Sequence, residues 1–127
     1  MAWLWPEMLA WPHWGKGGWP EILHLVVLVV LYPSIEEWVF RGQIQSWLLD
    51  HRWGRPRLGP VSVANALTSL LFAMLHLVAQ PPFLAMLVFI PSLVFGYARE
   101  RTAGLLWPIA LHGWYNLGWF LLFGLGG

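Results

Sequence analysis

A run of hydrocarbon side chains, from Leu25 to Leu31, is followed five residues later by two adjacent glutamates, Glu36 and Glu37. Arg41 follows Glu37 by about one helical turn. Ionisable side chains are costly inside a bilayer, and those found there usually face a polar interior and serve a function. The glutamate pair therefore predicts a functional site within a membrane-embedded helix.

The composition favours a membrane protein over a soluble one. The chain has 127 residues, of which 58% are hydrophobic and 10% are charged. A soluble domain carries about 25% charged residues, so this chain has too few polar side chains to cover a surface that faces water. The length allows one compact helical domain, which we place at residues 21–127 because no internal repeat or domain boundary is evident there.

Several classes of function are excluded by what the sequence lacks. The net charge is only +1 and the basic residues form no patch, so a nucleic-acid partner is not expected. The absence of cysteine excludes disulfides, thiolate metal sites and a cysteine nucleophile. The N-terminus lacks the basic region of a signal peptide, and prolines interrupt its apolar residues.

The hydropathy pattern predicts an all-α membrane bundle with about four membrane segments. Residues 1–20 are rich in tryptophan and proline, and we expect them to lie at the membrane interface, which tryptophan favours. The membrane segments are predicted at residues 21–49, 60–78, 82–97 and 105–125. Pro33 and Pro91 are expected to kink the first and third segments, because proline removes a helical hydrogen bond.

Positive charge predicts the orientation of these segments. The connection at residues 51–58 holds three arginines, and the connection at residues 99–104 holds two more. With four spans, both connections lie on the same side of the membrane. The positive-inside rule places that side in the cytoplasm, and both chain termini are then expected outside.

Four polar side chains are predicted to lie at similar depths in the membrane. With a rise of about 1.5 Å per residue, their depths from the arginine-rich side are roughly 21 Å for Glu36, 24 Å for His76, 16 Å for His112 and 22 Å for Asn116. Helix tilt can absorb the remaining differences. We therefore expect these four residues to line one cavity.

Spacing separates the two glutamates into different roles. Glu37 and Arg41 are four residues apart, so they share a helix face and are expected to form an ion pair. Glu36 points about 100° away from Glu37 on an α-helix. It has no cation at helical spacing, which makes it the better candidate for chemistry in the cavity.

The four cavity residues provide the groups that amide hydrolysis requires. Glu36 with His76 can remove a proton from water, as general-base catalysis requires. His112 and Asn116 can donate hydrogen bonds to a carbonyl oxygen as negative charge develops on it. No serine or threonine is marked as a nucleophile by a surrounding motif, so the pattern favours direct attack by water.

Three motifs resemble those of a known family of intramembrane proteases. They are Glu36-Glu37-x-x-x-Arg41, Phe72-x-x-x-His76 and His112-x-x-x-Asn116. Their order and separation resemble the CAAX protease and bacteriocin-processing family, also called CPBP or ABI, over about residues 20–125.

The resemblance implies a glutamic-type endopeptidase that needs no cofactor. It implies that Glu36 and His76 activate water, that His112 and Asn116 form the oxyanion hole, and that the Glu37–Arg41 pair supports them. The stretch at residues 88–97 also resembles the JDVT-CTERM subgroup, which belongs to a C-terminal protein-sorting system. That likeness implies a membrane-anchored protein substrate with a C-terminal sorting signal, processed in a bacterial inner membrane.

Three other interpretations remain open at this stage. The glutamates and histidines could hold zinc, although the His-Glu-x-x-His spacing of standard zinc proteases is absent and we favour the metal-free interpretation. The same scaffold could serve a non-catalytic membrane protein that binds a partner or confers immunity. Lastly, His76 and His112 could ligate haem.

Overall fold

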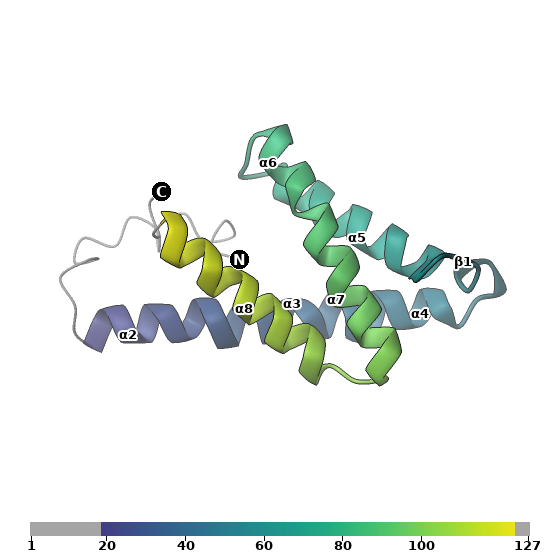
Figure 1. Ribbon diagram of the computed structural model, residues 1–127, viewed down its shortest axis with the longest axis horizontal. Helices are drawn as coiled ribbons and strands as arrows, with labels where there is room; N and C mark the ends of the chain where they lie inside the picture. Colours follow the sequence, from purple (N-terminus) through teal and green to yellow (C-terminus); the bar gives the residue numbers. More distant parts are fainter. Residues whose placement is uncertain (1–18, 124–127) are drawn as a thin grey trace.

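The computed structural model describes residues 19–123 of the chain (Figure 1). Most of the predicted interfacial segment, residues 1–18, lies outside the described residues. The described part is almost entirely helical and contains one short hairpin. The predicted all-α architecture is therefore confirmed.

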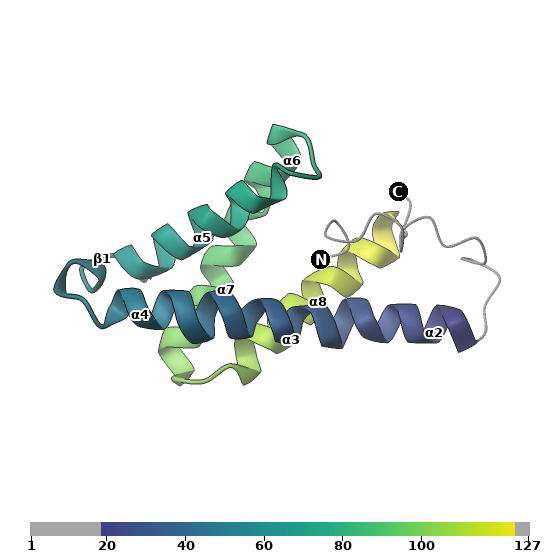
Figure 2. The same cartoon turned by 180° about the vertical axis from the view of Figure 1, so that it is seen from behind.

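The first helical run is continuous from residue 19 to residue 49. It is composed of α2 (Trp19–Val26), η2 (Val27–Leu31), α3 (Tyr32–Glu37), η3 (Trp38–Gln45) and α4 (Ser46–Leu49). The segments η2 and η3 are π-helical, a geometry that is rare and frequent at functional sites. Figures 1 and 2 show the whole run as one nearly straight rod. The kink predicted at Pro33 is therefore not found.

The hydrogen bond that Pro33 cannot donate within the rod is replaced by one from another helix. In a π-helix each N–H bonds the carbonyl five residues earlier, and Tyr32 N–H does so with Val27. The next carbonyl, that of Leu28, would need an N–H that Pro33 lacks. It instead accepts a hydrogen bond from Asn116 Nδ2 at 2.9 Å. Pro33 thus leaves the Leu28 carbonyl available to a side chain of the last described helix.

A compact turn follows the rod, where the sequence predicts only a connection. The 3₁₀ helix η4 (Arg52–Gly54) leads into strands β1 (Arg57–Leu58) and β2 (Val61–Ser62), which pair antiparallel. Gly59 has a φ of +61° and supplies the positive φ that two-residue hairpin turns require. The hairpin sets the start of the next helix, because Ser62 Oγ accepts a hydrogen bond from Asn65 N–H as an N-cap.

Four further helices complete the described chain. They are α5 (Val63–His76), α6 (Pro82–Leu87), α7 (Phe89–Thr102) and α8 (Leu106–Phe123). The third predicted segment is interrupted at Val88, three residues before the predicted kink at Pro91, since Pro91 has no N–H to offer the Leu87 carbonyl. Contacts place α7 against both α5 and α8, while α8 packs on η2 and α3 and α5 packs on η3 (Figure 2).

Burial in this bundle is the reverse of burial in a soluble protein. Buried polar and charged residues outnumber buried hydrophobic ones among the described residues. Large apolar side chains such as Val78, Leu121 and Leu122 are largely exposed. Two helices, Ile22–Leu49 and Pro82–Thr102, are long and apolar enough to cross a membrane. Together with the apolar exterior, they indicate an integral membrane protein.

The contact between α8 and the rod depends on Gly113. A Cβ added at Gly113 would lie 2.3 Å from the Val29 carbonyl oxygen, and this backbone atom cannot rotate away. We expect Gly113→Ala to lower the free energy of unfolding by roughly 1–3 kcal/mol, as overpacking does. Gly118→Ala on the same helix is the matched control, because nothing lies within 4 Å of its added Cβ. Equal thermal unfolding temperatures for the two variants would contradict the close approach.

Candidate active site

His112 lies between the two glutamates. Its Nδ1 is 2.8 Å from Glu37 Oε1 and its Nε2 is 3.4 Å from Glu36 Oε2. An ionised carboxylate only accepts hydrogen bonds, so Nδ1 carries the proton in the shorter contact. The glutamates belong to the last turn of α3 and the histidine to α8. The site is therefore assembled by the packing of α8 on the rod.

Arg41 forms an ion pair with Glu37 from the next turn of the rod. Its Nε lies 3.4 Å from Glu37 Oε2, and neither side chain is accessible to solvent. This contact confirms the ion pair predicted from their spacing. The guanidinium also lies 5.6 Å from the centre of the Phe72 ring, within the range of a cation–π interaction.

The buried charges can balance with one extra proton. Ionised Glu36 and Glu37 carry two negative charges, and Arg41 contributes one positive charge. Buried charges are costly unless they are paired, so a single proton on His112 or Glu36 makes the cluster neutral. With that proton on His112, Glu36 is left as a carboxylate, which is the form that a general base needs.

His76 is oriented by its own helix. Its Nδ1 lies 2.7 Å from the Phe72 carbonyl, which can only accept, so Nδ1 is the donor and Nε2 is the basic nitrogen. The Phe72 ring packs against both histidines, with centroid distances of 4.8 Å to His76 and 5.8 Å to His112. Phe95 stacks on His112 at 4.9 Å. These aromatic contacts bring α5 and α7 to the glutamate cluster.

Asn116 lies one turn after His112, with its amide on the rod. Asn116 Nδ2 donates a hydrogen bond to Leu28 O, and this bond uses one of the two hydrogens of the Asn116 amide. Asn116 and Glu36 are the most accessible of the six predicted site residues, at 8% and 6% exposure. The bundle therefore encloses all six residues.

The structure joins four of the six predicted residues in one chain of contacts, whereas Asn116 contacts the rod at Leu28 O. It also adds one residue that the sequence did not reveal. Glu36, Glu37 and His112 are in direct contact, Arg41 is joined to them through Glu37, and His76 reaches them across Phe72. The addition is Ser92 on α7, whose backbone and side-chain oxygens both accept from Arg41. A single serine in an apolar segment gives no sign of this contact.

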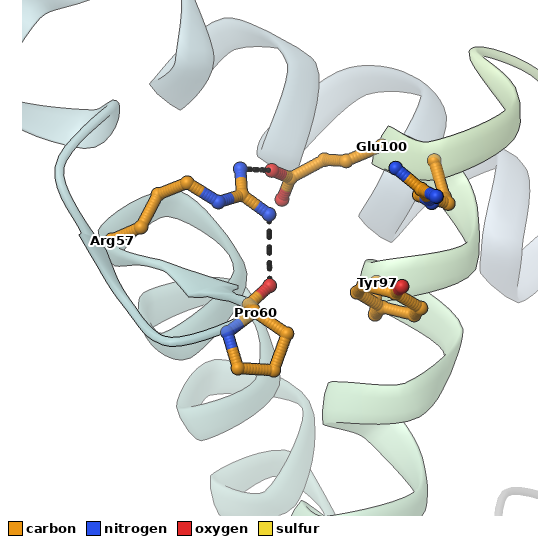
Figure 3. A pocket seen from close by; sticks show the side chains of 5 residues that line it. Arg57, Pro60, Tyr97 and Glu100 are labelled. Carbon is orange, nitrogen blue, oxygen red and sulfur yellow. Dashed lines mark hydrogen bonds and ion pairs between the residues drawn. The ribbon is translucent and has the colours of Figure 1, made fainter.

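A second polar network lies at the arginine-rich end of the bundle. Glu100 accepts hydrogen bonds from Gln45 at 2.6 Å, from Ser62 at 2.7 Å and from Arg57 at 2.7 Å. A pocket of about 400 Å³ opens beside it, lined by Arg57, Pro60, Tyr97, Glu100 and Arg101 (Figure 3). None of the predicted site residues lines this pocket. We therefore interpret the network as a structural bridge between the rod, the hairpin and α7.

The described side chains do not fit a metal centre. Among residues 19–123, no three His, Asp or Glu side chains converge in an arrangement that could hold a metal ion. Both nitrogens of His112 face carboxylates instead. A zinc site of standard type needs three protein ligands directed at one point.

The bundle and its buried Glu–His–Arg cluster define a membrane-embedded protein whose polar groups are suited to hydrolysis. The family model described as type II CAAX prenyl endopeptidase Rce1-like matches residues 18–118, a range that includes all three motifs. The chain belongs to this family of CAAX-type intramembrane proteases. No curated protein and no solved structure matches it.

Proposed function

We propose that this protein is a glutamic-type intramembrane endopeptidase that hydrolyses a peptide bond of a membrane-anchored protein. The observation that carries the proposal is the placement of His112 between Glu36 and Glu37, inside a bundle with an apolar exterior. A purely structural ion pair would need only Glu37 and Arg41. The second carboxylate adds a base next to a hydrogen-bond donor, as water activation requires.

The proposed reaction begins with water held by Glu36 and His76. Glu36 takes a proton from the water while the water oxygen attacks the scissile carbonyl carbon. His112 and the second Asn116 amide hydrogen donate to the resulting oxyanion. The tetrahedral intermediate then breaks its C–N bond, and the leaving amine takes the proton from Glu36. The products are a carboxylic acid and an amine, and no covalent enzyme intermediate forms.

The supporting residues keep the donor correctly oriented. Glu37 accepts from His112 Nδ1, so Nε2 is the nitrogen directed at Glu36 and the reacting oxygen. Arg41 compensates the charge of Glu37 and fixes its position. This arrangement follows the general pattern in which a third group orients the histidine of a catalytic set.

The proposed substrate is a protein held in the membrane next to its cleavage site. The apolar exterior of the bundle supports this, because it fits a substrate that lies in the same membrane. The likeness of residues 88–97 to the sorting subgroup suggests that the substrate carries a C-terminal sorting signal in a bacterial inner membrane. Mass spectrometry of the cleaved C-terminus would identify the bond, and an intact sorting signal in cells that contain the enzyme would contradict this substrate.

The proposed topology has four spans, with both termini outside. It is supported by the arginine-rich loop that follows the rod, where Trp47 and Trp53 are exposed, and by the contact from Arg57 to Glu100, which joins this loop to the last turn of α7. Alkaline phosphatase, which is active only outside the cytoplasm, is expected to be active when fused after Gly127. Green fluorescent protein fused at the same position is expected to show no fluorescence, because it would be exported in an unfolded form. Bright fluorescence with an inactive phosphatase would reverse the orientation.

The alternative function is a non-catalytic membrane protein that binds a partner or confers immunity. His112→Ala and His76→Ala separate the two classes, because each leaves the exterior of the bundle unchanged. For a protease, processing of a membrane-anchored substrate in cells is expected to fall at least about a hundredfold in each variant. Folded variants that keep full biological activity would favour the partner-binding protein.

A further inference from the structure

Ser92 is connected to the glutamate cluster through Arg41. Arg41 Nη2 donates to the Ser92 carbonyl at 2.6 Å and to Ser92 Oγ at 2.5 Å. Both residues are completely buried, although they lie 51 positions apart in the chain. Hydrogen bonds to a charged donor are the stronger ones. The serine thus fixes one end of the guanidinium from a different helix.

These contacts continue without a gap to the proposed base. From Ser92, the chain of contacts passes to Arg41, then 3.4 Å to Glu37, 2.8 Å to His112 and 3.4 Å to Glu36. It joins α7, η3, α3 and α8. A change at Ser92 can therefore reach His112 without a direct contact between the two residues.

Other side chains also hold the backbone of Arg41. Arg41 lies within the π-helical segment η3. The Arg41 carbonyl itself accepts from Ser46 Oγ at 2.8 Å and from Arg99 Nε at 3.3 Å. Side chains thus hold both the backbone and the guanidinium of this residue in place. A serine hydroxyl in a helix often bonds its own backbone, whereas Ser92 Oγ accepts from Arg41.

We propose that Ser92 is a positioning residue for the His112 imidazole and acts through Arg41 and Glu37. The proposal rests on the proposed function only for its effect on turnover. Its structural part, the control of the His112 hydrogen bond, stands independently. In Ser92→Ala, Arg41 loses one of the two acceptors of Nη2, so the guanidinium that pairs with Glu37 is held on α7 by one hydrogen bond instead of two.

The test combines turnover with a direct view of the imidazole. In Ser92→Ala, kcat for a membrane-anchored peptide is expected to fall roughly tenfold with KM little changed, as for one lost hydrogen bond to a charged group. The ¹⁵N resonances of His112, assigned by their loss in His112→Gln, are expected to shift. Ser92→Thr, which keeps the hydroxyl, is expected to restore both readouts.

Ser69→Ala is the matched control, because Ser69 is a buried serine whose Oγ bonds Asn65 and not Arg41. Unchanged kcat and unchanged His112 resonances in folded Ser92→Ala would overturn the positioning role. The same losses in Ser69→Ala would also overturn it, since they would indicate a general effect on packing. If the wild-type protein cleaves nothing but the His112 resonances still shift, the proposed function fails and the positioning role remains.

Discussion

Replacing Glu36 by glutamine is expected to reduce peptide cleavage by about 10²–10⁴-fold, the contribution of a well-placed general base. Glutamine keeps the shape of the side chain but cannot take a proton from water. The rate is measured with purified protein and a membrane-anchored peptide, by quantifying the shortened product. Because glutamine has nearly the same size as glutamate at this buried position, the thermal unfolding temperature is expected to change only slightly.

Asp50→Asn supplies the control for this charge change. Asp50 is an exposed carboxylate just after α4, at the far end of the same rod. Its replacement is expected to leave the cleavage rate within about twofold of wild type, since exposed sites distant from specific contacts have small effects. A folded Glu36→Gln variant that cleaves as fast as Asp50→Asn would remove Glu36 from the reaction.

Replacing Arg41 by methionine is expected to have the largest effect on stability. The substitution removes the guanidinium from a fully buried position and leaves the Glu37 carboxylate without its cation. Breaking a buried pair in this way costs about 3–5 kcal/mol. A reversible unfolding titration in mixed micelles measures this loss in the free energy of unfolding.

Two variants distinguish this effect from a simple loss of side-chain volume. Arg101→Met removes an exposed arginine and is expected to change the free energy of unfolding by less than about 0.5 kcal/mol. The double variant Glu37→Gln with Arg41→Met removes both charges and is expected to recover part of the loss. If Arg41→Met is as stable as Arg101→Met, the buried pair is not holding the site together.

The contacts within single helices could be predicted from the sequence. The spacing of Glu37 and Arg41 was sufficient to predict their ion pair, because residues four apart share a helix face. Hydropathy predicted the all-α bundle, since apolar runs of this length have few other stable forms in a bilayer. Depth estimates predicted that residues from three segments lie near one another, and the structure brings Glu36 and His112 into contact.

Contacts between helices could not be predicted in the same way. Which residue of α7 contacts Arg41 depends on how the two helices cross. The spacing of residues in a single sequence does not predict that crossing. The contact from Asn116 to Leu28 O arises because Pro33 cannot bond that carbonyl, and the π-helical geometry of η2 decides which carbonyl is left. The hairpin after η4 was missed because strands of two residues leave no alternating pattern, although Gly59 followed by proline indicates a turn.

Chelation tests directly whether Glu36, in contact with His112, activates water for peptide hydrolysis without a metal. The most direct test uses purified wild-type protein in liposomes with a membrane-anchored peptide and excess chelator, and mass spectrometry of the products. We predict that cleavage yields a new carboxylate terminus at the same rate with and without the chelator. Loss of cleavage on chelation, with recovery when zinc is added, would contradict a metal-free reaction.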